Sequence, residues 1–141
     1  MIIDERLADG NAARYRMTVA EELGHLVLHP NFVNQVGSVE EFCELQQHEM
    51  WYYVERNAKR FAAAILMPGN EVVKAAQEDY PKLVRTAGYG HVGAIERHLV
   101  HLLAKRFEVS QETMRYRLRE WTMKVLDRME AAIRDRLNYL D

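Results

Sequence analysis

A carboxylate and an imidazole lie four residues apart, at Glu21 and His25, in a segment whose apolar residues recur at helical spacing. No proline interrupts residues 16–29 and Pro30 follows directly, so we predict an amphipathic, largely buried helix that ends before the proline. Side chains four residues apart lie one above the other on the same helix face. Together they form half of a metal site, and Glu22 beside them has the position of a general base.

The residues from Glu21 to His25 match the motif H-E-x-x-H, with glutamate in place of the first histidine. The longer context, M-T-V-A-x-E-L-G-H-L-V-L-H, resembles the active-site helix of the ImmA/IrrE family of metallopeptidases. Residues 55–68 resemble the family segment E-x-x-A-N-x-F-A-x-x-L-M-P, and residues 103–110 resemble its closing segment L-A-x-x-F-x-V-S. The resemblance extends over about residues 1–121 of this chain.

The resemblance implies a mainly helical α+β fold of the zincin-like metallopeptidase type, with a small N-terminal sheet and a helical C-terminal part. It implies a zinc site with Glu21, His25 and Glu55 as the ligand positions, because a hydrolytic zinc needs three protein ligands and an open position for water. Glu22 would be the catalytic base that activates the metal-bound water. His29, one turn beyond His25, is predicted to support the site without binding the metal.

Two departures from the family pattern change the charge of this site. Glu21 replaces a histidine, which lowers the formal charge around a divalent ion from about +1 to about zero and weakens the activation of bound water. Lys59 replaces an asparagine and lies one helical turn after Glu55, on the same face. Two alternatives follow. Either the Lys59 ammonium substitutes for the charge of the metal and balances the clustered carboxylates, or Lys59 extends to solvent and zinc is still bound.

Three functions are consistent with these residues. The resemblance implies a partner that is typically a helix-turn-helix transcriptional repressor, often linked to mobile elements or stress responses. The chain would be a zinc-dependent endopeptidase that cleaves this repressor, or a pseudopeptidase, a non-catalytic module that binds it in the same cleft. The third function, a DNA-binding regulator, depends on residues 99–121, which resemble a helix-turn-helix bearing Arg115, Arg117 and Arg119. Flanking glutamates such as Glu112 argue against nucleic acid as a partner.

Composition excludes several other classes of protein. The chain of 141 residues has a formal net charge of −2, which argues against a membrane-surface or strongly nucleic-acid-binding protein. No apolar run approaches the ~20 residues of a membrane span, and no signal peptide is recognised. The single cysteine, Cys43, excludes an intrachain disulfide and has no basic cluster beside it that would make it a nucleophile. We therefore expect a cytoplasmic protein.

We predict a single domain, residues 1–141, with an active-site half at residues 1–80 and a helix-turn-helix-like half at residues 91–141. Capping signals, breakers and apolar periodicity place the other elements. In the first half they are a strand at residues 1–4, a loop at 31–37, a helical stretch capped by Ser38 and Glu41 that breaks near Gln47 and ends at Met67, and a short helix at 71–79. An irregular segment follows, bounded by Tyr80-Pro81 and Gly88-Tyr89-Gly90. The remaining predicted helices are at 94–107, 111–121 and 122–140.

Apolar residues at three- and four-residue steps identify the expected buried faces of these helices. In the first helix the expected stripe is Met17, Ala20, Leu23 and Val27, widened by Val19, Leu26 and Leu28. In the two longest C-terminal helices it is Ile95, Leu99, Leu102 and Leu103, and then Leu126, Met129, Ile133, Leu137 and Leu140. The stripe of the last helix fits packing within the domain and packing against a second copy equally well, so a homodimer is an open alternative.

Overall fold

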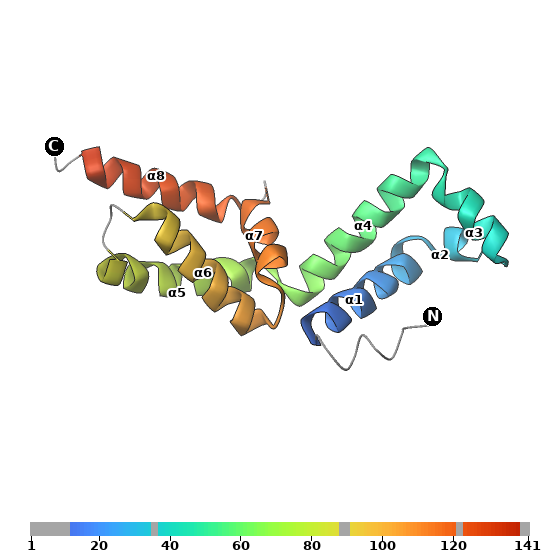
Figure 1. Ribbon diagram of the computed structural model, residues 1–141, viewed down its shortest axis with the longest axis horizontal. Helices are drawn as coiled ribbons and strands as arrows, with labels where there is room; N and C mark the ends of the chain where they lie inside the picture. Colours follow the sequence, from blue (N-terminus) through green and yellow to red (C-terminus); the bar gives the residue numbers. More distant parts are fainter. Residues whose placement is uncertain (1–11, 35–36, 88–90, 121–122, 139–141) are drawn as a thin grey trace. The chain divides into compact units, whose positions relative to one another are not determined.

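The computed structural model describes residues 12–34, 37–87, 91–120 and 123–138, with side-chain positions for all of these except Val33 and residues 136–138. The chain divides into two compact units, Met1–Leu66 (unit 1) and Met67–Asp141 (unit 2). The single domain with halves at residues 1–80 and 91–141 stays a prediction. Within the described ranges the helices are α1 (Ala12–Leu28), α2 (Pro30–Val33), α3 (Val39–Gln46), α4 (Glu49–Leu66), α5 (Gly69–Ala87), α6 (Val92–Phe107), α7 (Gln111–Arg119) and α8 (Val125–Asn138) (Figure 1).

The predicted α+β fold class is wrong for these residues, which are helical and contain no strand in any described range. The strand predicted at Met1–Asp4 lies outside the described residues. A strand is stable only when its backbone groups pair with a second strand. The described part of the chain offers no partner, because its apolar runs follow the 3.6-residue period of a helix instead of the alternating period of a strand.

In unit 1, α1 and α4 run antiparallel and side by side (Figure 1), and small residues line their contact. Ala20 and Gly24 are buried on α1, and Ala58 and Ala62 are fully buried on α4. A Cβ atom on Gly24 would lie 3.0 Å from the Cα atom of Ala58, closer than such atoms normally approach. Glycine therefore allows the two backbones to come this close, whereas any larger residue would require Ala58 or Phe61 to move by a few tenths of an ångström.

In α1 the burial predicted for Ala20 is confirmed, whereas the burial predicted for four large apolar residues is wrong. The exposed fractions are 44% for Leu23, 49% for Leu26, 56% for Val27 and 44% for Leu28. The face that packs is the one with Ala20 and Gly24, because small side chains allow the closest approach to α4 and hence the most complete exclusion of water. Apolar periodicity identified the helix and one residue of its packing face, Ala20, but not Gly24.

Large side chains fill unit 2. Ile95, Leu99 and Leu103 of α6 are fully buried as predicted, whereas Leu102 is 41% exposed and its predicted burial is wrong. Ser110 caps α7 by accepting a hydrogen bond from the backbone N–H of Thr113. The fully buried side chains of α7 and α8 are Met114, Leu118, Leu126 and Ile133, joined by Met129 at 8% exposure. Burial of Leu126, Met129 and Ile133 is thus confirmed, while the side chains of Leu137 and Leu140 lie outside the described set.

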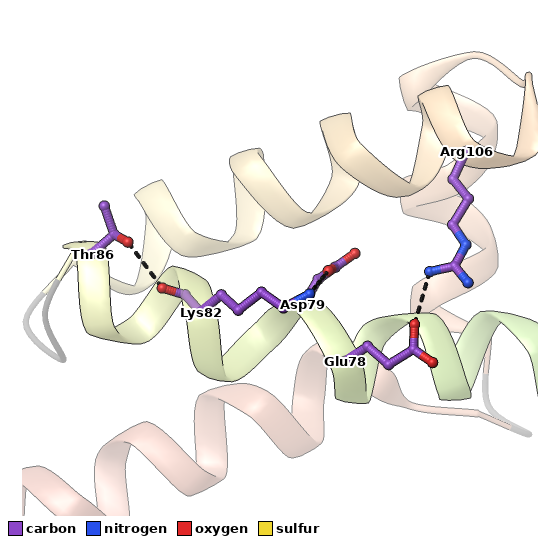
Figure 2. Close-up of polar contacts among 5 residues, drawn as sticks. All are labelled: Glu78, Asp79, Lys82, Thr86 and Arg106. Carbon is purple, nitrogen blue, oxygen red and sulfur yellow. Dashed lines mark hydrogen bonds and ion pairs between the residues drawn. The ribbon is translucent and has the colours of Figure 1, made fainter.

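Helix α5 continues through Pro81, so the irregular segment predicted from Tyr80-Pro81 is wrong over Tyr80–Ala87. A proline inside a helix removes one backbone hydrogen bond. Packing compensates here, because Val84, beyond the proline, is buried in unit 2. Figure 2 shows polar contacts on both sides of this point: Arg106 of α6 reaches Glu78, Lys82 pairs with Asp79, and the Thr86 hydroxyl donates to the Lys82 carbonyl.

Local signals in unit 1 are largely confirmed. Ser38 and Glu41 form the predicted capping box at the start of α3, and the helical stretch breaks at Gln47 as predicted. The loop predicted at residues 31–37 is wrong in part, because Pro30–Val33 forms the short helix α2. Proline suits the first turn of a helix, where its missing N–H would have had no partner, so Pro30 both ends α1 and begins α2.

Candidate functional site

The close crossing of α1 and α4 brings His25 and Glu55 together. The His25 Nε2 atom lies 3.2 Å from the Glu55 Oε1 atom, and the side chains are 16% and 30% exposed. His25 follows Gly24, the residue in closest approach to Ala58, and Glu55 precedes Ala58 by one helical turn. The two predicted site residues are therefore adjacent because small residues line the contact between their helices.

Lys59 lies one turn after Glu55, and its Nζ atom is 3.8 Å from the second carboxylate oxygen, Oε2. The Lys59 side chain is 58% exposed. It thus extends toward solvent while its ammonium remains beside the carboxylate, which combines features of both predicted alternatives. One Glu55 oxygen faces an imidazole and the other faces an ammonium, so this carboxylate has two partners within the protein.

Glu21 lies one turn before His25 on α1, as the spacing predicts. Burial raises the pKa of Glu21 above its usual value, and the nearby Glu55 and Glu22 carboxylates raise this pKa as well. Lys59 and His25 act in the opposite direction, with Lys59 the stronger of the two. The net pKa of Glu21 remains raised, so its carboxyl keeps a proton to higher pH than an exposed glutamate does.

These residues do not fit a three-ligand zinc centre in this arrangement. Two ligands of a tetrahedral zinc lie roughly 3.4 Å apart, so the 3.2 Å separation of His25 and Glu55 would suit a pair of ligands. Across the described residues, however, no three His, Cys, Asp or Glu side chains lie close enough together to hold a metal ion. Glu21, His25 and Glu55 therefore remain predicted ligand positions, and no reaction step is derived from a metal here.

A cleft of about 460 Å³ opens beside the His25–Glu55 pair. Trp51 of α4 lines this cleft and contacts two other lining residues. The Trp51 ring stacks on the His25 ring at 6.3 Å between centroids, and the Phe42 ring meets it edge-on at 5.4 Å. The volume lies within the ~300–1,000 Å³ that small-molecule pockets have. The lining residues come from α1 to α4 and are Glu22, His25, Phe32, Phe42, Leu45, Gln46, Trp51, Val54 and Glu55.

The predicted base and the predicted supporting histidine take different places around this cleft. Glu22 lines it together with His25 and Glu55. The His29 ring lies 6.3 Å from the His25 ring, between centroids, and its Nε2 atom is buried without a hydrogen-bond partner among the described residues. His29 therefore packs next to His25, while its predicted supporting role stays a prediction.

The aromatic wall of the cleft was not predicted from the sequence. Phe32, Phe42 and Trp51 are separated by about ten residues each and belong to three different helices, so no local spacing connects them. The composition of the segment nevertheless contains a signal, which is the one-sided charge around these aromatic residues. Residues 17–55 contain seven glutamates but no lysine, arginine or aspartate, so aromatic residues here occur in an otherwise acidic stretch.

The arginines of the helix-turn-helix-like segment are engaged within unit 2. Arg115 and Arg119 both pair with Glu96 of α6, at 3.6 and 3.1 Å. Arg117 is buried, donates to the Met67 carbonyl and pairs with Glu120. These contacts hold α7 against the rest of unit 2 and leave the guanidinium groups less available for phosphate oxygens.

A family model for the IrrE N-terminal-like domain matches residues 8–119 of this chain. A search of curated proteins and a search of solved structures found no match. None of the helices within the described ranges combines the length and apolar character needed to cross a membrane. Because the matched region covers most of the chain and includes α1, α4 and the cleft between them, the chain belongs to the family of the IrrE N-terminal-like domain, which is metallopeptidase-like.

Proposed function

We propose that this chain is a pseudopeptidase, a protein-binding module derived from a metallopeptidase domain, and that its cleft holds a segment of a transcriptional repressor. The observation that carries the proposal is the pairing of His25 and Lys59 with the two oxygens of Glu55, directly beside a cleft lined by aromatic rings. Protein side chains thus supply the partners of a carboxylate that the resemblance assigns to zinc. The cleft itself retains the size and apolar lining of a binding site.

The choice of a repressor as partner comes from the resemblance to ImmA/IrrE proteins and is tested directly. The full chain is incubated with the helix-turn-helix repressor encoded nearest to it, and both complex formation and cleavage are measured. A stable complex without cleavage, weakened by Trp51→Ala, is the expected result. Tyr116→Ala is the matched control, because Tyr116 is an exposed aromatic residue of unit 2. Absence of a complex, or a complex unaffected by changes in the cleft, would contradict the proposal.

The metal question is tested on the two positions that depart from the family pattern. We expect the unchanged chain to hold no stoichiometric zinc after exposure to zinc and dialysis, measured by elemental analysis. The double change Glu21→His and Lys59→Asn restores the family residues, and it should increase the zinc content toward one equivalent because an imidazole replaces a carboxylate and the competing ammonium is removed. One tightly held zinc in the unchanged chain would overturn the metal-free part of the proposal.

A peptidase is the second candidate, favoured by the position of Glu22 in the wall of the cleft beside His25 and Glu55. On this alternative the repressor is cut, and Glu22→Gln abolishes the cut while leaving the complex intact. Cleavage that persists in Glu22→Gln would point to a contaminating protease. Cleavage that depends on Glu22 would replace the pseudopeptidase proposal with the enzyme.

A further inference from the structure

We infer that the occupant of this cleft is a basic peptide segment that inserts one large apolar side chain beside Trp51. The inference rests on the proposed binding function and specifies its ligand. It follows from two independent properties of unit 1, which are the apolar lining of the cleft and the negative charge of the segments that form it.

The apolar property comes from the walls of the cleft. Trp51 contacts Phe42 edge-on and Phe32 in a tilted arrangement, and Leu45 and Val54 complete the apolar lining. The exposed fraction of Phe42 is 38%, so this wall is open to a ligand. A large apolar side chain that enters the cleft exchanges water for aromatic contacts on several sides, which is the main source of affinity at such sites.

The charge property comes from the composition of the segments that form the cleft. Residues 17–55 supply α2, α3, most of α1 and the start of α4, and they contain no lysine or arginine. The two nearest basic residues that follow this stretch are already in contact with other side chains. Lys59 pairs with the Glu55 carboxylate, and the Arg56 guanidinium lies over the rings of Tyr52 and Tyr53. The glutamates of the stretch are Glu21, Glu22, Glu40, Glu41, Glu44, Glu49 and Glu55.

This charge favours a cationic ligand and disfavours an anionic one. Glu40, Glu44 and Glu49 are exposed on α3 and at the start of α4, the helices that contribute Phe42, Leu45 and Trp51 to the cleft. Complementary charge at the rim of an interface steers the partner and sets its orientation, while the apolar anchor supplies affinity. A segment with a Leu, Met or Phe side chain flanked by Lys or Arg satisfies both properties, whereas nucleic acid and acidic peptides are repelled.

The test selects peptides with the full chain from a phage-displayed library of random peptides of about 12 residues. Selected sequences are expected to contain a large apolar residue with two or more Lys or Arg nearby. In synthetic copies of these peptides, replacing the apolar residue with alanine should weaken binding by about 10- to 100-fold. Raising NaCl from about 50 mM to about 500 mM should weaken it by about fivefold or more.

Matched variants of the chain separate charge from fold. The first variant removes exposed negative charge near the cleft by combining Glu40→Gln, Glu44→Gln and Glu49→Gln. It should weaken binding of the selected peptides by about fivefold or more. The control combines Glu71→Gln, Glu112→Gln and Asp127→Asn, which are exposed acidic residues in first turns of unit 2 helices, and it should change binding by less than about twofold. Two separate variants, Trp51→Ala and Leu45→Ala, test whether peptide binding depends on the apolar lining of the cleft. Circular dichroism verifies that both variants are folded.

The outcomes distinguish the inference from the function on which it rests. Peptides that need Trp51 but lack basic residues, or that bind equally at both salt concentrations, overturn the basic ligand and leave the binding cleft in place. Peptides that need basic residues but tolerate loss of the apolar side chain overturn the apolar anchor. Failure to select any peptide that depends on Trp51 or Leu45 overturns both the inference and the proposed binding function.

Discussion

Units 1 and 2 bury different kinds of residue. Unit 2 buries large side chains completely, among them Ile95, Leu99 and Leu118, and forms a conventional helical core. Unit 1 buries mainly small residues, such as Ala58 and Ala62, and leaves many of its large apolar side chains exposed. These exposed residues include Leu23, Leu26, Val27, Leu28, Met50, Tyr52, Tyr53 and Ile65.

The difference shows what each kind of packing is suited to. A core of large side chains removes more apolar area from water and stabilises the fold more strongly. A contact made by alanine and glycine removes less area, but it brings two backbones close together and so places polar side chains such as His25 and Glu55 in contact across the helices. The site therefore lies in unit 1. The stability of unit 1 depends on a few small residues whose replacement by larger ones would disturb the contact between α1 and α4.

Truncation of the unit 2 core gives the largest expected effect. Leu99→Ala should lower the free energy of unfolding by about 2–5 kcal/mol, because Leu99 is fully buried and the alanine leaves a cavity. Urea denaturation of the full chain measures it. Leu102→Ala is the control on the same helix, since Leu102 is 41% exposed and should cost far less. Equal losses for the two changes would mean that α6 is not packed as described.

The second-largest effect is expected when a small residue in the contact between α1 and α4 is replaced by a larger one. Gly24→Ala should destabilise unit 1 by about 1–3 kcal/mol, because the new Cβ would lie 3.0 Å from the Ala58 Cα and force the helices apart. Gly93→Ala is the matched control, since the nearest atom to its Cβ is the end of the Arg97 side chain at 3.8 Å. Alanine is the better helix former, so this control should be neutral or stabilising by up to about 1 kcal/mol. Thermal unfolding compares the two variants, and a neutral Gly24→Ala would contradict the close contact.

The raised pKa of Glu21 predicts a pH dependence whose direction is opposite to that of a salt-bridged carboxylate. Burial lifts this pKa above 4.5, so the folded state holds the proton more tightly than the unfolded state does. The resulting contribution to stability is present at low pH and is lost as the pH rises through the raised pKa. Glu21→Gln should therefore stabilise the protein at neutral pH, and the gain should disappear below about pH 4.5.

Urea denaturation across this pH range, in buffer with a chelator, measures the effect of Glu21→Gln. Glu44→Gln is the control for loss of an exposed negative charge. Destabilisation by Glu21→Gln at neutral pH would show that the ionised carboxylate is stabilised in the fold, for instance by Lys59, and that burial is not the dominant influence on its pKa.

Removal of the Lys59 ammonium should have the smallest effect on stability. Lys59→Met should change the free energy of unfolding by less than about 1 kcal/mol, because this side chain is largely exposed and its contact with Glu55 is screened by solvent. A double-mutant cycle with Glu55→Gln isolates the coupling of the pair. A coupling well above that value would indicate that Lys59 and Glu55 form a buried ion pair, and unit 1 would then depend on charge as well as on small residues.

Short-range chemistry made part of this structure predictable. The capping box of Ser38 and Glu41, the cap at Ser110 and the break at Gln47 all depend on contacts within a few residues, and the sequence alone determined them. The same is true of the shared face of Glu21 and His25, which follows from helical geometry once the helix is recognised. The segments that resemble the ImmA/IrrE family likewise indicated the family that the family model confirms.

Only the tertiary structure decided which residues of α1 pack against α4. The predicted stripe held Ala20 together with larger side chains such as Leu23 and Val27. Of these, Ala20 is buried, and Gly24 joins it, because their small size lets the backbones approach. That approach also determines which distant residues meet: His25 with Glu55, and Trp51 with Phe32 and Phe42. Local periodicity depends on neighbours along the chain, whereas the distance between two helices depends on the fit of whole surfaces, and so the cleft arises only on folding.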